Sequence, residues 1–186
     1  MKVDGIWANI FRLHTGKESL AEILQNIPLF HELSTKELKI LERMVHIRTY
    51  LPGEPVFVET EPGAGMYVIR SGRVDIVLNN KRESQLMLAE LETGDFFGEM
   101  ALLGDTSRSA TAVARERSEL IGFFHPDLLE IISIHPTMGA RISIGLAKAL
   151  AQRLRYTNSQ LRDIWDLRGH HERIQLDDSS AQLSRI

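Results

Sequence analysis

The chain has 186 residues, of which 43% are hydrophobic and 25% are charged, and it carries a formal net charge of -3 at pH 7. This balance indicates one compact soluble domain with attached helices, and it disfavours broad binding to a nucleic-acid backbone. The chain has no cysteine, which excludes disulfides, thiolate metal sites and a cysteine nucleophile and fits a cytoplasmic protein. It shows neither a secretory signal nor an apolar run long enough for a membrane span.

Residues 1–44 are predicted to form an N-terminal helical segment. Within it, residues 6–13 carry their apolar side chains on one side, as in a short amphipathic helix. Such a helix can dock on the chain's own barrel or on a dimer mate, or alternatively on a partner protein or a membrane surface. We favour docking on the barrel or the dimer mate.

Two capping boxes mark helices in the same segment. Ser19 and Glu22 stand ahead of an apolar pair, and Ser34 and Glu37 repeat their spacing within the sequence LSTKELKIL. In a capping box the serine side chain accepts a hydrogen bond from the backbone of the glutamate, whose carboxylate reaches back to the serine N–H. The second box predicts a helix over residues 35–44.

Residues 45–124 alternate short β-rich runs with turns that contain glycine and proline. The runs are VHIRTYL, PVFVE, MYVIR, RVDIVL, QLMLAEL, TAVARE and ELIGFF. Several short strands at regular spacing favour a barrel or a sandwich. The expected fold class is mainly β with flanking helices: a jelly-roll-like β-barrel with N-terminal helices and C-terminal hinge and long helices.

Residues 125–168 are predicted to form a hinge helix and a long C-terminal helix. Two His-Pro pairs place Pro126 and Pro136 at the first positions of these helices. In the long helix, apolar residues recur at spacings of three and four over residues 142–164, and the part after Leu154 resembles a coiled-coil seam. This repeat predicts a homodimer through the C-terminal helix.

The last residues, 169–186, are polar and are predicted to be a loose tail. The tail is too short to hold the two packed helices of a helix-turn-helix domain, so direct DNA recognition is not expected. The basic side chains of the long helix are interpreted as a solvated face rather than as a nucleic-acid patch.

The segment FGEMALLGDTSRSATAVA, residues 97–114, carries the residues that indicate a binding site. Gly98 allows close approach of the backbone, and one helical turn after it would offer free N–H groups to an anion. Arg108 supplies a planar fork of donors suited to phosphate oxygens, and Ser109 adds a hydroxyl. Glu99 can accept a hydrogen bond from a sugar hydroxyl. Together these residues predict a pocket for a ribose phosphate.

This segment resembles the phosphate-binding cassette of the cyclic nucleotide-binding domain family, of the type found in catabolite activator protein and in regulatory subunits of cyclic-AMP-dependent kinase. The resemblance extends from about Leu29 to Asp166. The stretch PGEPVFVETEPGAGMYVIRSGRVDI is similar to the first strands and turns of the family, and ETGDFFGEMALL followed by RSATA is similar to its cassette. The two later helices resemble the family's B and C helices.

The resemblance implies a role for each matching residue. Glu99 would hold the ribose 2′-hydroxyl, and Arg108 would pair with the cyclic phosphate. Ser109 and Ala110 would donate backbone N–H groups to the same phosphate, and a threonine–asparagine pair on the long helix would meet the base. The implied ligand-binding residues are Gly98, Glu99, Met100, Ala101, Leu102, Arg108, Ser109, Ala110, Thr157 and Asn158.

Two departures from the family pattern affect these expectations. Ser107 stands where many members have a proline before the arginine, which leaves the loop less rigid. No helix-turn-helix sequence follows the long helix, so a downstream partner protein, which the sequence does not identify, is expected to receive the signal.

Ligand binding is expected to shift the hinge helix over residues 126–134, and the long helix, against the barrel. The hinge helix would pack its apolar face, formed by Leu128, Leu129 and Ile132, near Met100 and Leu103 of the cassette. Closure of the cassette around a phosphate would then repack that face, and the ligand would shift the equilibrium by its differential affinity for the two states.

The expected function is a stand-alone cyclic nucleotide sensor, a regulatory module and not an enzyme. Cyclic AMP is favoured because Ser109 matches catabolite activator protein, and cyclic GMP stays open because a hydroxyl can also bond to the guanine 2-amino group. The histidines are scattered, so no metal site is expected, and no paired nucleophile and base stand out. The alternative is an interaction or structural protein whose barrel no longer binds nucleotide. The intact Glu99 and Arg108 favour the sensor.

Overall fold

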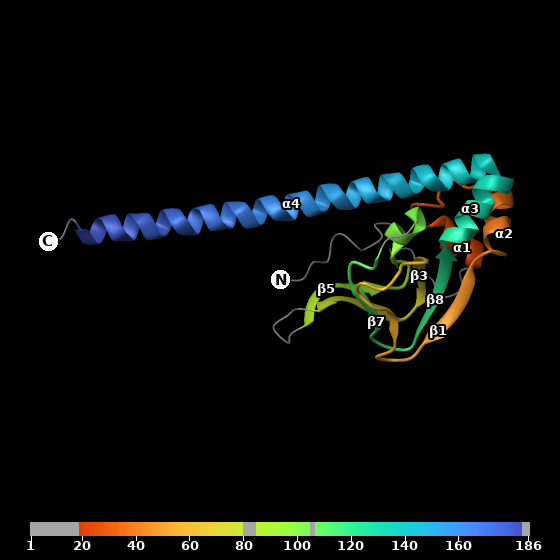
Figure 1. Ribbon diagram of the computed structural model, residues 1–186, viewed down its shortest axis with the longest axis horizontal. Helices are drawn as coiled ribbons and strands as arrows, with labels where there is room; N and C mark the ends of the chain where they lie inside the picture. The colour runs from red at the N-terminus through yellow and green to blue at the C-terminus, as the bar shows by residue number, and fades with distance from the viewer. Residues whose placement is uncertain (1–18, 80–84, 105–106, 184–186) are drawn as a thin grey trace. The chain divides into compact units, whose positions relative to one another are not determined.

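The computed structural model describes residues 19–79, 85–104 and 107–183 (Figure 1). The chain divides into two units, Met1–Ala149 and Leu150–Ile186. The first unit holds the strands and the short helices, and the boundary falls within the long helix. The predicted amphipathic segment at residues 6–13 lies outside the described residues.

Both predicted capping boxes are confirmed at the N-terminal helices. Helix α1 spans Leu20–Gln25 and helix α2 spans Thr35–Leu41. At α2 the Glu37 N–H donates to the Ser34 hydroxyl at 3.4 Å, and the Ser34 N–H donates to the Glu37 carboxylate at 2.8 Å. The helix ends at Leu41 rather than at residue 44. Just after it, backbone N–H groups donate to carbonyls three residues earlier in the chain, and such bonds form a tighter turn than an α-helix has.

Eight strands in the described residues form two antiparallel sheets. The strands are β1 (His46–Tyr50), β2 (Pro55–Phe57), β3 (Gly65–Ser71), β4 (Arg73–Asn79), β5 (Gln85–Glu92), β6 (Phe96–Phe97), β7 (Thr111–Ala114) and β8 (Ser118–Phe124). One sheet has the order β1-β8-β3-β6 and the other the order β2-β7-β4-β5. All the predicted β-rich runs become strands, and the jelly-roll fold consists of two sheets rather than one closed barrel.

The hydrophobic core draws on both sheets. Ile69 and Leu120 come from the first sheet and Val74 and Ala112 from the second, and each is 0% exposed. On β4, Val74 and Ile76 enter this core two positions apart, as the alternation of side chains along a strand requires. Burial of a Val, Leu or Ile side chain stabilises a fold by about 1.5–3 kcal/mol. The two sheets that the β-rich runs form therefore position the candidate site.

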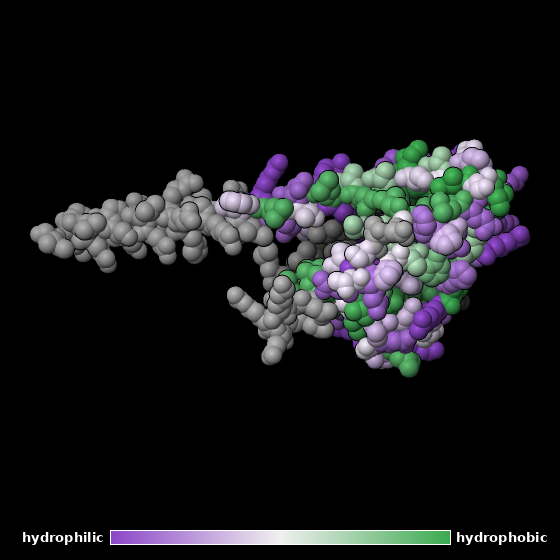
Figure 2. All heavy atoms as spheres, viewed as in Figure 1, coloured by the Kyte–Doolittle hydropathy of each residue, from purple (hydrophilic) through white to green (hydrophobic). Residues whose placement is uncertain are grey.

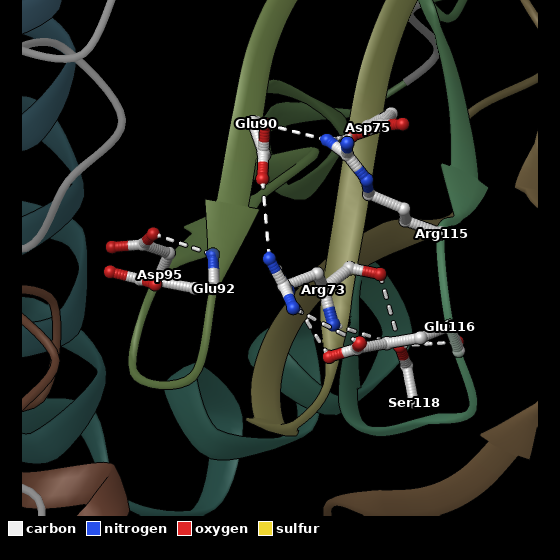
Figure 3. Close-up of polar contacts among 8 residues, drawn as sticks. All are labelled: Arg73, Asp75, Glu90, Glu92, Asp95, Arg115, Glu116 and Ser118. Atoms are coloured by element: carbon white, nitrogen blue, oxygen red, sulfur yellow. Dashed lines mark hydrogen bonds and ion pairs between the residues drawn. The ribbon is translucent and has the colours of Figure 1, made fainter.

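Charged side chains of the second sheet form ion pairs across its strands (Figure 3). Arg115, which follows β7, contacts Glu90 on β5 at 2.6 Å and Asp75 on β4 at 3.6 Å. Arg73 pairs with Glu116 at 3.2 Å. Burial raises the pKa of Asp75, and Arg115 acts in the opposite direction. Because exposed ion pairs typically contribute about 0.2–1 kcal/mol, these pairs add little to the stability of the fold.

Two helices follow β8, as predicted. Helix α3 spans His125–Ile134 with a proline in its first turn, and helix α4 spans Pro136–Leu183. Figure 1 shows α1, α2 and α3 gathered at one end of the strands β1 and β8. The predicted apolar face of α3 needs correction, because the structure buries Leu128 and Ile131, whereas Leu129 and Ile132 are exposed. Residues three apart share a helix face, and this pair faces the core.

The first turns of α4 belong to the first unit and pack against its other elements. Met138, Ile142 and Leu146 are buried there. Gly145 permits a close approach, because a Cβ at this position would lie 2.7 Å from the carbonyl oxygen of Leu29. Part of the apolar repeat that predicted a dimer seam thus serves the chain's own core.

Helix α4 continues to Leu183, so the tail predicted from residue 169 is helical in its backbone. Residues 170–183 contain neither proline nor glycine, and helix propagation costs little once the preceding turns exist. A single glycine at position 169 costs about 1 kcal/mol relative to alanine and does not stop the helix. In the described part of the chain, no helix combines the length and the apolar character needed to cross a membrane.

Candidate functional site

The predicted cassette begins at a glycine with left-handed backbone. Strand β6 ends at Phe97, opposite Tyr67 of β3, and Gly98 follows with φ 75°. The short 3-10 helix η1 then spans Glu99–Leu103, which confirms the predicted helical turn. A Cβ on Gly98 would lie 2.8 Å from Nη1 of Arg108. Both the backbone conformation and the available space therefore require glycine.

The side chain of Arg108 lies against this turn, as the sequence predicted. The residue is 7% exposed, and its Nη1 donates to the Gly98 carbonyl oxygen at 3.2 Å. Its backbone N–H donates to the Glu61 carbonyl at 2.8 Å, and the Thr60 N–H donates to the Arg108 carbonyl at 2.8 Å. The loop between β2 and β3 therefore fixes the backbone of Arg108.

The guanidinium of Arg108 is a buried cation. Burial lowers the pKa of Arg108 from its ordinary value, while Tyr67, Glu99 and Glu61 act in the opposite direction. Glu99 is itself only 2% exposed, so an acid and a cation are buried at one site. Among the described residues, Nε of Arg108 has no hydrogen-bond partner. A buried cation with a remaining donor suits an anion such as a phosphate.

Three aromatic rings, from Phe57, Tyr67 and Phe97, form a cluster of which one ring lies against this cation, and sequence reasoning missed their role. Their centroids lie between 5.7 and 6.1 Å apart. Cζ of Arg108 lies over the Phe57 ring, 3.9 Å from its centroid. In the run PVFVE an aromatic residue indicates only a strand. No local spacing links Phe57 with Arg108, because the pairing of β2 with β7 brings them together.

The other predicted cassette residues divide between the core and the surface. Ala101 and Leu102 are buried, whereas Met100 is 51% exposed. Ser109 is exposed and Ala110 is buried. Neither the Ser109 N–H nor the Ala110 N–H donates to a backbone carbonyl of another described residue. These two N–H groups follow Arg108 directly, as an anion-binding loop requires.

One feature connects the cassette region to the helices. Nδ1 of His125, the first residue of α3, lies 2.7 Å from the carbonyl oxygen of Leu102, in hydrogen-bond range. Thr157 and Asn158 are exposed on α4 in the second unit, and the Thr157 hydroxyl donates to the Arg153 carbonyl at 3.0 Å. The predicted contact of this pair with a base stays a prediction.

The donors of the site suit an organic anion rather than a metal ion. Arg108 and the backbone N–H groups are cationic or neutral donors, whereas a metal ion needs several acidic or imidazole ligands. Within the ranges that the structure describes, no group of three or more histidine, aspartate or glutamate side chains could hold a metal ion.

Comparison with known proteins identifies the family. The family described as "Cyclic nucleotide-binding domain" matches residues 47–135, which include the whole cassette. Residues 47–135 belong to the cyclic nucleotide-binding domain family. The Cyclic AMP receptor protein of Thermus thermophilus is 35% identical over 138 residues, which cover 74% of this chain and 62% of that protein. A cAMP-dependent protein kinase regulatory subunit of Colletotrichum orbiculare is 34% identical over 93 residues, covering 50% of this chain and 23% of that protein.

A solved structure agrees with this assignment. The crystal structure of Thermus thermophilus Catabolite Activator Protein matches with a TM-score of 0.65 and 36% sequence identity, covering 73% of this chain and 62% of that one. The chain therefore spans less than two thirds of the length of each of these relatives. The similarity includes the cyclic nucleotide-binding domain and the jelly-roll fold.

We expect Gly98→Ala to destabilise the cyclic nucleotide-binding domain more than Gly53→Ala. Both glycines have positive φ, 75° and 80°, so each alanine costs about 1–2 kcal/mol for a left-handed backbone. Only at Gly98 does the new Cβ meet Arg108, 2.8 Å from its Nη1, whereas nothing lies within 4 Å at Gly53. Urea denaturation measures the two free energies of unfolding. Equal losses would contradict the close packing of Arg108 on this turn.

Proposed function

We propose that this chain is a cyclic nucleotide sensor, with cyclic AMP as its favoured ligand, and that it acts as a regulatory module rather than as an enzyme. The observation that carries the proposal is the buried Arg108 guanidinium beside Gly98 and Glu99. The names of the relatives support cyclic AMP, since one is a cyclic AMP receptor and another a regulatory subunit of a cAMP-dependent kinase.

Each polar group of the site has a part in this proposal. Arg108 pairs with the cyclic phosphate, and the N–H groups of Ser109 and Ala110 donate to the same oxygens. Glu99 accepts a hydrogen bond from the ribose 2′-hydroxyl, because a carboxylate repels a phosphate but accepts hydrogen bonds from hydroxyl groups. These roles need no metal ion and no nucleophile.

Calorimetric titration of the full chain with cyclic AMP and with cyclic GMP tests the proposal. We expect both nucleotides to bind, and cyclic AMP more tightly. Tighter binding of cyclic GMP would point to a hydrogen bond from the guanine 2-amino group to the Ser109 hydroxyl. If neither nucleotide binds, the alternative of an interaction protein without a nucleotide ligand is preferred.

Arg108→Ala is expected to weaken binding of cyclic AMP by about 2–5 kcal/mol, because it leaves the phosphate charge without its partner in a buried site. Glu99→Ala should weaken binding less, since it removes only the contact to the ribose. Arg117→Ala is the matched control, because this arginine is exposed and its loss changes the net charge equally. If Arg108→Ala bound as tightly as the parent chain, the pocket would be assigned wrongly.

We also propose a homodimer through the part of α4 that lies in the second unit. Leu154, Leu161 and Trp165 are 62%, 50% and 73% exposed, and their spacing of seven and four residues puts them on one stripe of the helix. A second copy of the helix would cover this apolar stripe in a coiled coil.

Leu154→Glu combined with Leu161→Glu should convert the dimer to monomers, because the two charges would oppose burial of the stripe. Sedimentation at micromolar concentration measures the assembly state. Gln152→Glu combined with Ser159→Glu is the control, since it adds the same charges at the same spacing on other exposed positions. A parent chain that sediments as a monomer would contradict the proposal.

The signal is proposed to pass from the cassette to the hinge helix α3. The observation behind this is the 2.7 Å contact between His125 Nδ1 and the Leu102 carbonyl, together with the burial of Leu128 and Ile131 in the first unit. Closure of the cassette around a phosphate would move Leu102 and with it the start of α3. A partner protein that contacts the helices would then detect the change.

Hydrogen exchange with and without cyclic AMP measures this relay. We expect protection to change in the cassette and also over residues 126–164, because α3 and α4 must repack when the cassette closes. Protection that is confined to residues 98–110 would indicate a binder without a switch.

A further inference from the structure

We propose that Phe57 is a positioning residue for Arg108: a cation–π contact holds the guanidinium in place and leaves its N–H donors for the phosphate. This inference rests on the proposed binding of a cyclic nucleotide at this site. Phe57 ends β2, and Arg108 precedes β7. Since β2 pairs with β7, the strand pairing of the second sheet creates the contact.

The contact has the geometry of a strong cation–π pair. Cζ of Arg108 lies 3.9 Å from the centroid of the Phe57 ring, well within the range of about 6 Å in which such pairs interact. Arg108 is only 7% exposed, and a cation that is out of water gains more from a ring face than a cation at the surface. Phe57 therefore offsets part of the cost of burying this charge.

A ring suits this position better than a carboxylate. An acidic partner would accept hydrogen bonds from the guanidinium and would compete with a phosphate for the same N–H groups. An aromatic face attracts the charge while the donors at the guanidinium edge stay available. Among the described residues, Arg108 donates to the Gly98 carbonyl through Nη1, and its Nε has no partner. The cation is thus held in place with donors remaining for an anion.

The Phe57 ring is itself held in place. The rings of Tyr67 and Phe97 lie 6.1 and 5.8 Å from it, centroid to centroid. A Cβ on Gly98 would lie 3.3 Å from Cε1 of Phe57, so the cassette turn is in close contact with the ring. An arginine that is already ordered by such surroundings loses less conformational entropy when the phosphate binds.

Graded fluorination of Phe57 tests the electrostatic part of the contact. Mono-, di- and trifluorophenylalanine withdraw electron density from the ring face and change its shape little. We expect the affinity of the full chain for cyclic AMP, measured by calorimetry, to fall stepwise along the series. The loss for the trifluoro variant should be at most roughly thirtyfold, the size of a desolvated cation–π contact, because the contact also forms without nucleotide and only its ordering of Arg108 for the phosphate is lost.

The same fluorination series at Phe30 is the matched control, because Phe30 is a buried ring that packs on Phe123 and lies outside the cassette. Affinity should stay unchanged there. Without nucleotide, fluorination of Phe57 should lower the unfolding free energy of the parent chain but not that of Arg108→Met. A flat affinity series at Phe57 in a chain that binds cyclic AMP would overturn the positioning role and leave the proposed function standing. A parent chain that binds neither nucleotide would overturn both.

Discussion

The burial of the Arg108 charge is the constraint on which the site depends. A guanidinium that is transferred out of water loses its hydration, and the fold must replace those favourable interactions with water by contacts of its own. It does so with the face of Phe57, the carbonyl of Gly98 and the nearby acids Glu61 and Glu99. These groups come from separate segments of the chain, so the site exists only when the two sheets have formed and the loops between their strands have closed.

Backbone geometry adds a second requirement to this constraint. Gly98 adopts a left-handed conformation so that η1 can turn away directly after β6, and the missing side chain leaves room for the guanidinium. The reciprocal hydrogen bonds between Arg108 and the loop at Thr60 and Glu61 fix the other side of the site through the main chain. The backbone at Arg108 is thus positioned largely by main-chain groups.

The helices after β8 have two different roles. The first turns of α4 complete the core of the first unit, where Gly145 lies against the backbone of Leu29. The part of α4 in the second unit exposes Leu154, Leu161 and Trp165, the apolar stripe on which the proposed homodimer rests. Between the sheets and α4 lies α3, whose first residue, His125, is in hydrogen-bond range of the cassette. In the proposed relay, α3 would carry a change at the cassette to the surface that a partner protein contacts.

The sequence alone determined the features that rest on local physics. Capping boxes at Ser19 and Ser34, prolines at helix starts, alternating β-rich runs and the cassette with Gly98 and Arg108 are all encoded by neighbouring residues, so pattern and chemistry predicted them. The tertiary structure decided what depends on distant pairing. It placed Phe57 under Arg108, divided the apolar repeat of α4 between core and surface, and buried Ile131 instead of Ile132, because contacts between segments far apart in the chain leave no periodic signal in either segment.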